Sequence, residues 1–114
     1  MDVNNVKSQM RKGMLEYCIL LLLHREQAYA SDIIRKLKEA RLIVVEGTLY
    51  PLLTRLKNDN LLGYEWVEST QGPPRKYYRL TGKGEVFLSE LENSWRELNE
   101  TVEQLRNQGE GSQE

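Results

Sequence analysis

The 114-residue sequence is poor in cysteine and histidine, and each shortage excludes a class of site. One cysteine, Cys18, cannot form an internal disulfide, so nothing points to an oxidising compartment. One histidine, His24, leaves no metal-ligand cluster and no His-based constellation for nucleophilic catalysis. We interpret the two residues as a small buried hydrophobe and a cation at a helix end, and we expect no cofactor and no enzymatic activity.

Long hydrophobic runs are also missing. The longest apolar run, residues 17–23, is far too short to cross a bilayer, and the polar N-terminus has no signal-peptide pattern. We therefore expect a cytoplasmic protein that makes no use of a membrane. With 114 residues the chain is long enough for one domain with a modest core.

The charge is small overall but unevenly divided. The net charge at pH 7 is −1, which on its own argues against nucleic acid as a partner. Residues 1–80, however, hold 13 Lys and Arg against 9 Asp and Glu, whereas residues 81–114 hold 3 against 8. A mildly basic body is thus followed by an acidic segment, and the steering of a charged partner depends on that division.

Apolar periodicity predicts three helices in the first half of the chain. The first is expected over Val6–His24 and the second over Tyr29–Ala40, with an extended connection or a minor strand at 41–45. The third begins near Gly47 or Thr48, and its apolar stripe consists of Leu49, Leu52, Leu53 and Leu56. Its opposite face carries hydroxyls and cations, which suits a DNA groove as well as an exposed protein surface.

Two strand-like runs follow, Gly63–Glu68 and Lys76–Leu80. The segment between them contains Gly-Pro-Pro, which we expect to form the tip of a hairpin because proline cannot continue a strand ladder. By strand parity, four side chains are expected to point inward: Tyr64, Trp66, Tyr78 and Leu80. Two basic residues near the tip, Arg75 and Lys76, have no evident packing role.

The last helix is expected to begin after Thr81 as its N-cap. Its apolar residues follow the 3,4 spacing of a coiled-coil seam: Leu88, Leu91, Trp95, Leu98, Val102 and Leu105. A narrow seam of this kind favours pairing with a second copy of the chain over docking on its own core. We predict a dimerisation helix over 81–106 and a disordered tail over 107–114.

Three helices followed by a hairpin with a basic tip is the order of a winged helix-turn-helix. The predicted fold class is therefore mainly α with a small β-hairpin: a DNA-binding winged helix-turn-helix over residues 1–80 and a long C-terminal helix. In this architecture the third helix enters the major groove and the wing contacts the adjacent DNA. An alternative is a winged-helix module that binds another protein and never contacts DNA.

Three stretches also resemble a known family: 47–62 (GTLYPLLTRLKNDNLL), 72–84 (GPPRKYYRLTGKG) and 13–23 (GMLEYCILLLL). Together they are similar to the PadR-type bacterial transcriptional regulators, and the short C-terminal part is similar to the subgroup that includes multidrug-sensing repressors. The resemblance implies a homodimeric repressor of an inverted-repeat operator, dimerised mainly through the last helix with help from the first. Asn60 stands where the family motif usually has glycine, and asparagine accepts the same left-handed backbone.

Roles can be assigned to the candidate DNA-binding residues as hypotheses. Phosphate clamps would be Tyr50, Lys57, Arg75 and Lys76, while Thr48, Pro51 and Thr54 would read base edges. Arg55 would read guanine or hold phosphate, and Arg35 on the second helix completes the basic set. Tyr50 has an alternative interpretation, because it could pack beside the leucines of its own helix.

Trp95 lies within the predicted seam, where a two-fold axis would bring two indoles together. It either fills the interface or, as in the drug-sensing relatives that the sequence resembles, binds a planar aromatic effector between the subunits. A glutamate near by, Glu92, would favour a cationic compound. Bound effector would change the distance between the two recognition helices and so release the DNA.

Overall fold

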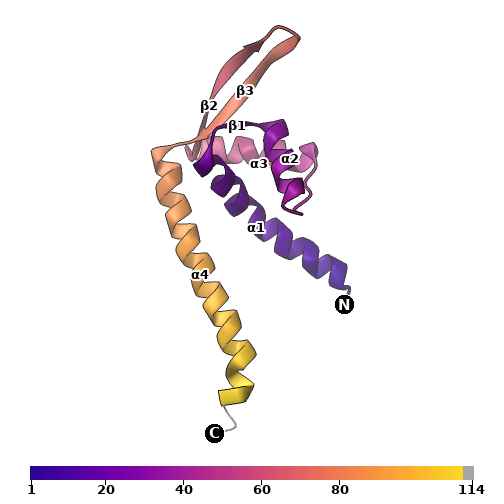
Figure 1. Ribbon diagram of the computed structural model, residues 1–114, viewed down its shortest axis with the longest axis vertical. Coiled ribbons are helices and arrows are strands. Elements are labelled where there is room, and N and C mark those ends of the chain that lie inside the picture. Colours follow the sequence, from indigo (N-terminus) through magenta and orange to yellow (C-terminus); the bar gives the residue numbers. More distant parts are fainter. Residues whose placement is uncertain (112–114) are drawn as a thin grey trace.

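The computed structural model describes the backbone of residues 1–111 and the side chains of residues 1–108. Its elements, in chain order, are α1 (Val3–Arg25), β1 (Ala28–Tyr29), α2 (Ala30–Glu39), α3 (Glu46–Asn58), β2 (Leu62–Ser69), β3 (Gly72–Leu80) and α4 (Gly82–Gly111). A compact body of helices carries the β2–β3 hairpin at one end, and α4 runs away from it at the other (Figure 1). The predicted fold class, mainly helical with a small sheet and a long last helix, is confirmed.

The core lies where α1, α2 and α3 meet beneath the sheet. The largest fully buried side chains are aliphatic and come from all three helices: Ile19, Leu20, Ile33, Leu49 and Leu53. The apolar run 17–23 is central as expected, with each of its residues buried or half-buried. The leucine stripe of α3 is also buried throughout, so this helix can only present its opposite face to a partner.

The helix α1 is longer than its apolar pattern. It begins at Val3 because the Asp2 side chain accepts a hydrogen bond from the Asn4 N–H at 2.9 Å, which makes Asp2 an N-cap. Its first half stands away from the body, on the other side of the molecule from the far end of α4 (Figure 1). Val6 and Met10 on this half are exposed, so an apolar surface on α1 has no partner within the described part of the chain.

The sheet has a third strand that the sequence did not reveal. The strand order is β1-β3-β2, all antiparallel, with Ala28 opposite Tyr78 and Tyr29 opposite Tyr77. Two residues are too few to show an alternating pattern, which explains why β1 was missed. The minor strand considered for segment 41–45 is absent, since that segment is an irregular connection whose Arg41 has a φ of 67°.

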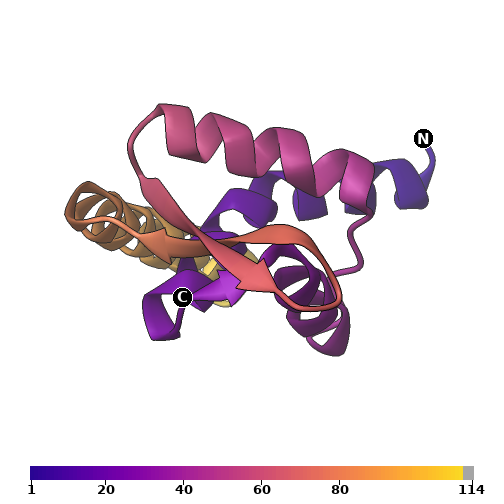
Figure 2. The ribbon, with the colours of Figure 1, turned by 90° about the horizontal axis from the view of Figure 1, so that it is seen from above.

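The wing is longer than expected, and Gly72–Pro74 belongs to β3 rather than to a tip. The predicted break was wrong because β1 covers β3 only at Tyr77 and Tyr78, so proline farther out faces an open edge and removes no ladder bond there. The turn consists of Thr70 and Gln71. Figure 2 shows the hairpin lying over the helical body, with α3 along one side.

The inward parity expected for the hairpin holds only near its base. Tyr78 is buried, and Tyr64 and Leu80 are half-buried and pack against the core. Trp66, on the same face, is 61% exposed. The expected direction of Trp66 was correct but its burial was not, because Trp66 lines an open hollow between the wing and the helices and is not packed in the core.

The start of α4 is fixed to the body by Thr81. Its hydroxyl accepts a hydrogen bond from the Gly84 N–H at 2.9 Å and donates to the Asn60 carbonyl at 2.7 Å, which confirms Thr81 as N-cap. Asn60 has a φ of 64°, as expected for a residue in place of glycine. A Cβ at position 84 would overlap the carbonyl oxygen of Leu61, so this contact requires Gly84.

The predicted seam of α4 divides into two parts. Leu88 is 3% exposed and belongs to the core, with the half-buried Leu91 packed beside it, so its assignment to a dimer seam was wrong. The four later residues are exposed: Trp95, Leu98, Val102 and Leu105. We call these four the α4 stripe.

The helix also continues past the predicted boundary at 106 as far as Gly111. Residues 107–111 are therefore helical, contrary to the predicted tail, because a glycine inside a helix costs only about 1 kcal/mol relative to alanine. The last three residues of the predicted tail, 112–114, lie outside the described residues.

Candidate nucleic-acid interface

The exposed face of α3 is the obvious contact surface, since the leucine stripe fixes which side chains point outward. Four residues run along its centre at helical spacing: Gly47, Pro51, Thr54 and Asn58. Thr48 and Arg55 lie on the flank toward α1, whereas Tyr50 and Lys57 lie on the flank toward the wing. The sequence interpretation had selected neither Gly47 nor Asn58, although both share this exposed face with Pro51 and Thr54.

Pro51 lies deeper in the helix than expected. The helix begins at Glu46, so Pro51 is its sixth residue, and the bond its N–H would have made to the Gly47 carbonyl is missing. The helix thus begins one or two residues before the start that was predicted near Gly47 or Thr48. Gly47 is exposed, so its carbonyl can bond to water, and the ring of Pro51 adds a rigid apolar group to the outer face of α3.

A hollow of about 330 Å³ separates α3 from the wing. Its walls come from β1 and the start of α2, from α3 and from the hairpin: Tyr29, Ala30, Ser31, Tyr50, Thr54, Trp66, Pro74, Arg75, Lys76 and Tyr78. We call it the wing hollow. It brings together four residues that the sequence had selected on two separate segments, namely Tyr50, Thr54, Arg75 and Lys76.

Arg75 is held in place by neighbours that the sequence did not indicate. The centre of its guanidinium lies 3.9 Å from the ring centroid of Tyr29, and its Nη2 donates to the Ser31 hydroxyl oxygen at 2.6 Å. Tyr29 in turn contacts Tyr77, with ring centroids 4.8 Å apart. The view that Arg75 has no packing role was wrong, and the side chain is oriented before any partner binds.

Lys76 packs on the opposite face of the wing, as adjacent strand residues must. Its Nζ lies 4.6 Å from the ring centroid of Tyr64 and 5.4 Å from that of Trp66. Lys57 of α3 approaches the same Tyr64 ring at 5.9 Å. Ammonium groups from α3 and from β3 thus share one aromatic support, which limits their freedom while leaving each charge available.

A second hollow, of about 240 Å³, lies on the other flank of α3. It is lined by Lys12, Leu15, Glu16, Thr48, Pro51, Leu52 and Arg55, and we call it the α1 hollow. Arg55 Nη2 makes an ion pair with Glu16 Oε1 across it. Lys12 adds a cation beside the same surface, and the sequence had given no reason to select it, because it is one of several charges on an exposed helix.

Arg35 is the one selected residue that does not lie near the exposed face of α3 or the wing. It lies on α2 and pairs with Asp32 at 3.5 Å and with Glu39 at 3.2 Å. It lines neither the wing hollow nor the α1 hollow. Its two carboxylate partners satisfy its charge, so the structure gives no support for a place in the contact surface.

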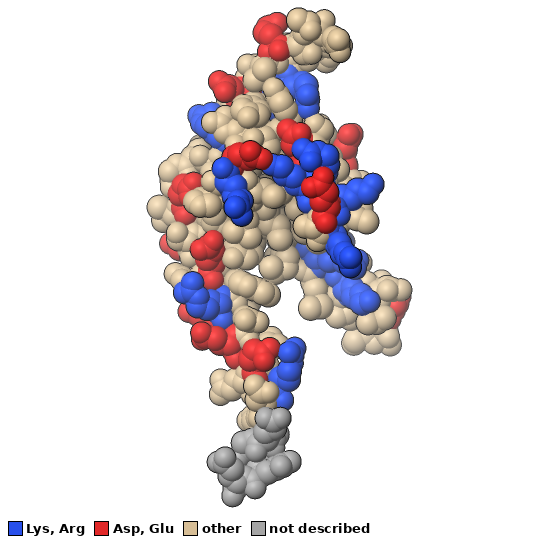
Figure 3. All heavy atoms as spheres, viewed as in Figure 1, with Lys and Arg blue, Asp and Glu red and all other residues tan. Residues whose placement is uncertain are grey.

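On the face shown in Figure 3, Lys and Arg alternate with Asp and Glu over the body and along α4 and form no broad basic patch. Helix α3 lies on the far side of the body from this view (Figure 2).

The residues considered for an effector lie at the start of the exposed part of α4. Trp95 is 44% exposed, and Glu92 is half-buried near Tyr17 of α1. The pKa of Tyr17 is raised, first by burial and then by the negative charge of Glu92. The charge of Glu92 on α4 is therefore near enough to Tyr17 of α1 to act on its hydroxyl.

A hollow of about 740 Å³ lies between α1 and α2 and includes Cys18. Burial raises the pKa of the Cys18 thiol, which makes it a poor nucleophile and supports its interpretation as a small hydrophobe. His24 Nδ1 lies 2.7 Å from Glu85 Oε2 and so connects the end of α1 to α4. Within residues 1–111 no group of three or more His, Cys, Asp or Glu could hold a metal ion, and no helix is long and apolar enough to cross a membrane.

Comparison with known proteins gives one consistent result. The family model for the transcriptional regulator PadR-like family matches residues 19–90. A PadR-like transcription factor from Bacteroides fragilis is 86% identical, with a TM-score of 0.77 over 89% of this chain and 98% of that one. A PadR family regulator from Eggerthella lenta is 36% identical, with a TM-score of 0.85 over 90% of each chain. An uncharacterized Lysinibacillus sphaericus protein is 30% identical over 101 residues, 86% of this chain and 93% of that protein.

Proposed function

The chain belongs to the PadR-like family of transcriptional regulators, and from this premise we propose that it is a homodimeric repressor of an inverted-repeat operator. Proteins of this family are regulators that bind DNA, generally as dimers, and are not enzymes.

One observation carries the proposal: α3 and the wing converge on the wing hollow. Thr54 from α3 and the cations Arg75 and Lys76 from β3 line the same space. A recognition helix supplies base contacts, while the wing supplies phosphate contacts that fix its register. The two cations of β3 lie beside the uncharged residues at the centre of the exposed face of α3, which suits phosphate contacts beside base contacts.

The individual roles follow from the position of each side chain. Pro51 and Thr54, at the centre of the exposed face, read base edges together with Thr48 on its flank. Phosphate contacts come from Lys57, Arg75, Lys76 and the hydroxyl of Tyr50, which is 48% exposed. Arg35 contributes at most to the general field, because both its neighbours are acidic.

The second copy is expected on the α4 stripe. Its side chains are 44 to 64% exposed over a rigid helix, and burial would stabilise a dimer by about 1.5 to 3 kcal/mol for each large residue fully covered. Val6 and Met10 on α1 offer a second exposed apolar surface that could be covered in the same dimer. A two-fold axis at α4 supplies the second α3, which must lie about 34 Å from the first to reach successive major grooves.

An aromatic, often cationic effector between the subunits would act on that distance. Trp95 offers an aromatic surface and Glu92 a negative charge between α4 and α1. A ligand held by both helices would favour one angle between them, and an angle that separates the two α3 helices incorrectly releases the operator.

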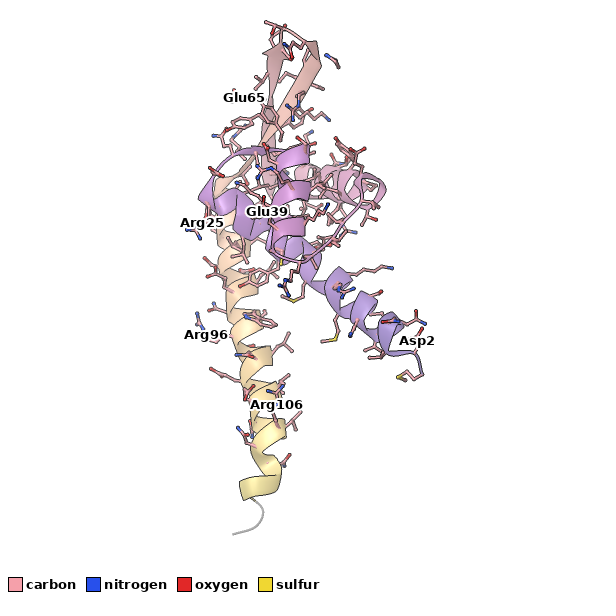
Figure 4. The ribbon with its side chains drawn as sticks, turned by 45° about the vertical axis from the view of Figure 1, so that its right-hand side comes forward. Asp2, Arg25, Glu39, Glu65, Arg96 and Arg106 are labelled. Carbon is pink, nitrogen blue, oxygen red and sulfur yellow. The ribbon has the colours of Figure 1, made fainter. Side chains whose placement is uncertain are left out.

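The proposal is tested by gel shift on the DNA upstream of the protein's own gene and its neighbours, at two salt concentrations. The expected result is a shifted band that survives excess unrelated DNA and weakens at the higher salt. Arg25→Ala removes a positive charge away from the site and should leave this binding unchanged, because Arg25 lines neither the wing hollow nor the α1 hollow (Figure 4). Binding that does not distinguish these segments from unrelated DNA would refute the sequence-specific function.

A further inference from the structure

The ion pair between Glu16 and Arg55 is the feature that the proposed contacts leave unexplained. It joins α1 to α3 across 39 positions of sequence, and it places a carboxylate beside a cation on the recognition helix. Both side chains are in contact with solvent, and the exposed fraction is 61% for Arg55 and 40% for Glu16. Pairs this exposed contribute little to stability, so stability does not account for it.

We propose that Glu16 is a positioning residue that directs Arg55 toward a guanine edge and away from the phosphates. The inference rests on the proposed DNA-binding function and deepens it by assigning specificity to a residue outside α3. Arg55 is the one arginine of α3, and arginine is the side chain that reads guanine O6 and N7 in bidentate fashion. Its orientation therefore matters more than its charge.

The chemistry of the guanidinium allows both contacts at once. Arginine has five N–H donors in a rigid fork, and Glu16 uses Nη2 alone. The remaining donors stay free for a base edge, and the carboxylate fixes the plane in which they lie. An arginine without such a partner rotates about a long flexible side chain and binds any phosphate within reach.

The surroundings agree with a position at the groove rather than on the backbone. Arg55 shares the α1 hollow with Thr48 and Pro51, two of the residues proposed to read bases. The negative charge of Glu16 also repels phosphate oxygens from that hollow, whereas an uncharged base edge is not repelled. Glu16 thus lowers the affinity for arbitrary DNA more than the affinity for the operator.

The test compares Glu16→Gln with the unmodified protein on two duplexes, an operator selected from random DNA and a shuffled duplex of the same composition. The glutamine keeps the size of the side chain but loses its charge. Binding to the shuffled duplex should tighten. The slope of log K against log salt should steepen by about 0.9 for each bound protomer, because Arg55 gains a phosphate contact. The preference for the operator should fall about fivefold, the low end of what a bidentate base contact provides.

Two controls separate this from a simple change of charge. Glu103→Gln removes a carboxylate whose Oε1 lies 3.0 Å from Arg106 Nη1, near the end of α4 that is remote from α3 (Figure 4). This variant should leave the operator preference unchanged. In an Arg55→Ala background, Glu16→Gln should have no further effect on preference, because the group it positions is gone. Thermal unfolding of both glutamine variants should match the unmodified protein.

The outcomes are distinct. An unmodified protein that prefers the operator, together with Glu16→Gln of unchanged preference, overturns the positioning role and leaves the proposed function standing. Equal effects of Glu16→Gln with and without Arg55 overturn it as well, since the carboxylate would then act on DNA directly. An unmodified protein that shows no preference for any selected duplex refutes the proposed function and this inference together.

Discussion

Arg75 is the side chain whose removal gives the sharpest quantitative expectation. It is one proposed phosphate contact on the wing, and it is oriented by Tyr29 and by the Ser31 hydroxyl. Arg75→Ala removes the charge without touching α3 or the core, because the side chain is exposed. The loss of one charge-assisted hydrogen bond should weaken operator binding by about 1.5 to 3 kcal/mol, or roughly 10- to 150-fold.

The salt dependence provides an independent number. Each phosphate neutralised on duplex DNA contributes about −0.9 to the slope of log K against log salt. Between about 50 and 200 mM salt, one contact fewer should make the loss of affinity about 3.5-fold smaller in the variant than in the unmodified protein. Two protomers on one operator would double this difference in slope, since each protomer brings its own wing.

Fluorescence anisotropy of a labelled operator, measured at several salt concentrations, checks both numbers. Arg75→Lys is the matched variant: it keeps the charge and the slope but loses the fork, so it should recover only part of the affinity. Thermal unfolding should change little in either variant, because an exposed cation–π contact is worth about 0.5 to 1 kcal/mol. Unchanged affinity and unchanged slope in Arg75→Ala would refute the assignment of the wing to the DNA backbone.

Three further predictions address the dimer, the effector and the base of α4. Leu98→Glu places a charge in the α4 stripe and should give a monomer in sedimentation velocity; a persistent dimer would locate the interface elsewhere. An aromatic cation should quench Trp95 fluorescence in a Trp66→Phe background, and no quenching at saturation would count against an effector site at Trp95. Gly84→Ala forces a Cβ onto the Leu61 carbonyl and should lower the free energy of unfolding by about 1 to 3 kcal/mol in urea denaturation, whereas an unchanged value would mean that α4 shifts without cost.

The helices of this protein could be predicted from the sequence because their apolar stripes are long. The leucine stripe of α3 and the apolar run of α1 define both the elements and the buried faces. The end of α4 could not be predicted, since Asn107, Gly109 and Gly111 are poor helix formers and yet the helix continues as far as Gly111. The strand β1 was beyond any periodicity argument, as two residues carry no period.

The candidate site was predicted residue by residue but not as an arrangement. Arg75 could be chosen from its charge and its place on a wing, yet its support by Tyr29 depends on β1 pairing with β3. The pair between Glu16 and Arg55 joins positions that no local pattern relates. Leu88 was assigned to the dimer seam because heptad spacing cannot tell which part of a helix its own domain already covers.

In the proposed complex, two copies of α3 and of the wing read one operator together. This arrangement is tested most directly by measuring stoichiometry and affinity on a duplex with both half-sites and on one with a single half-site replaced by unrelated sequence. Two protomers should bind the complete operator, and replacing one half-site should weaken binding about a hundredfold, because the second contact is then lost from a linked pair. One protomer per duplex, with equal affinity for both DNAs, would rule out a dimer that reads two half-sites.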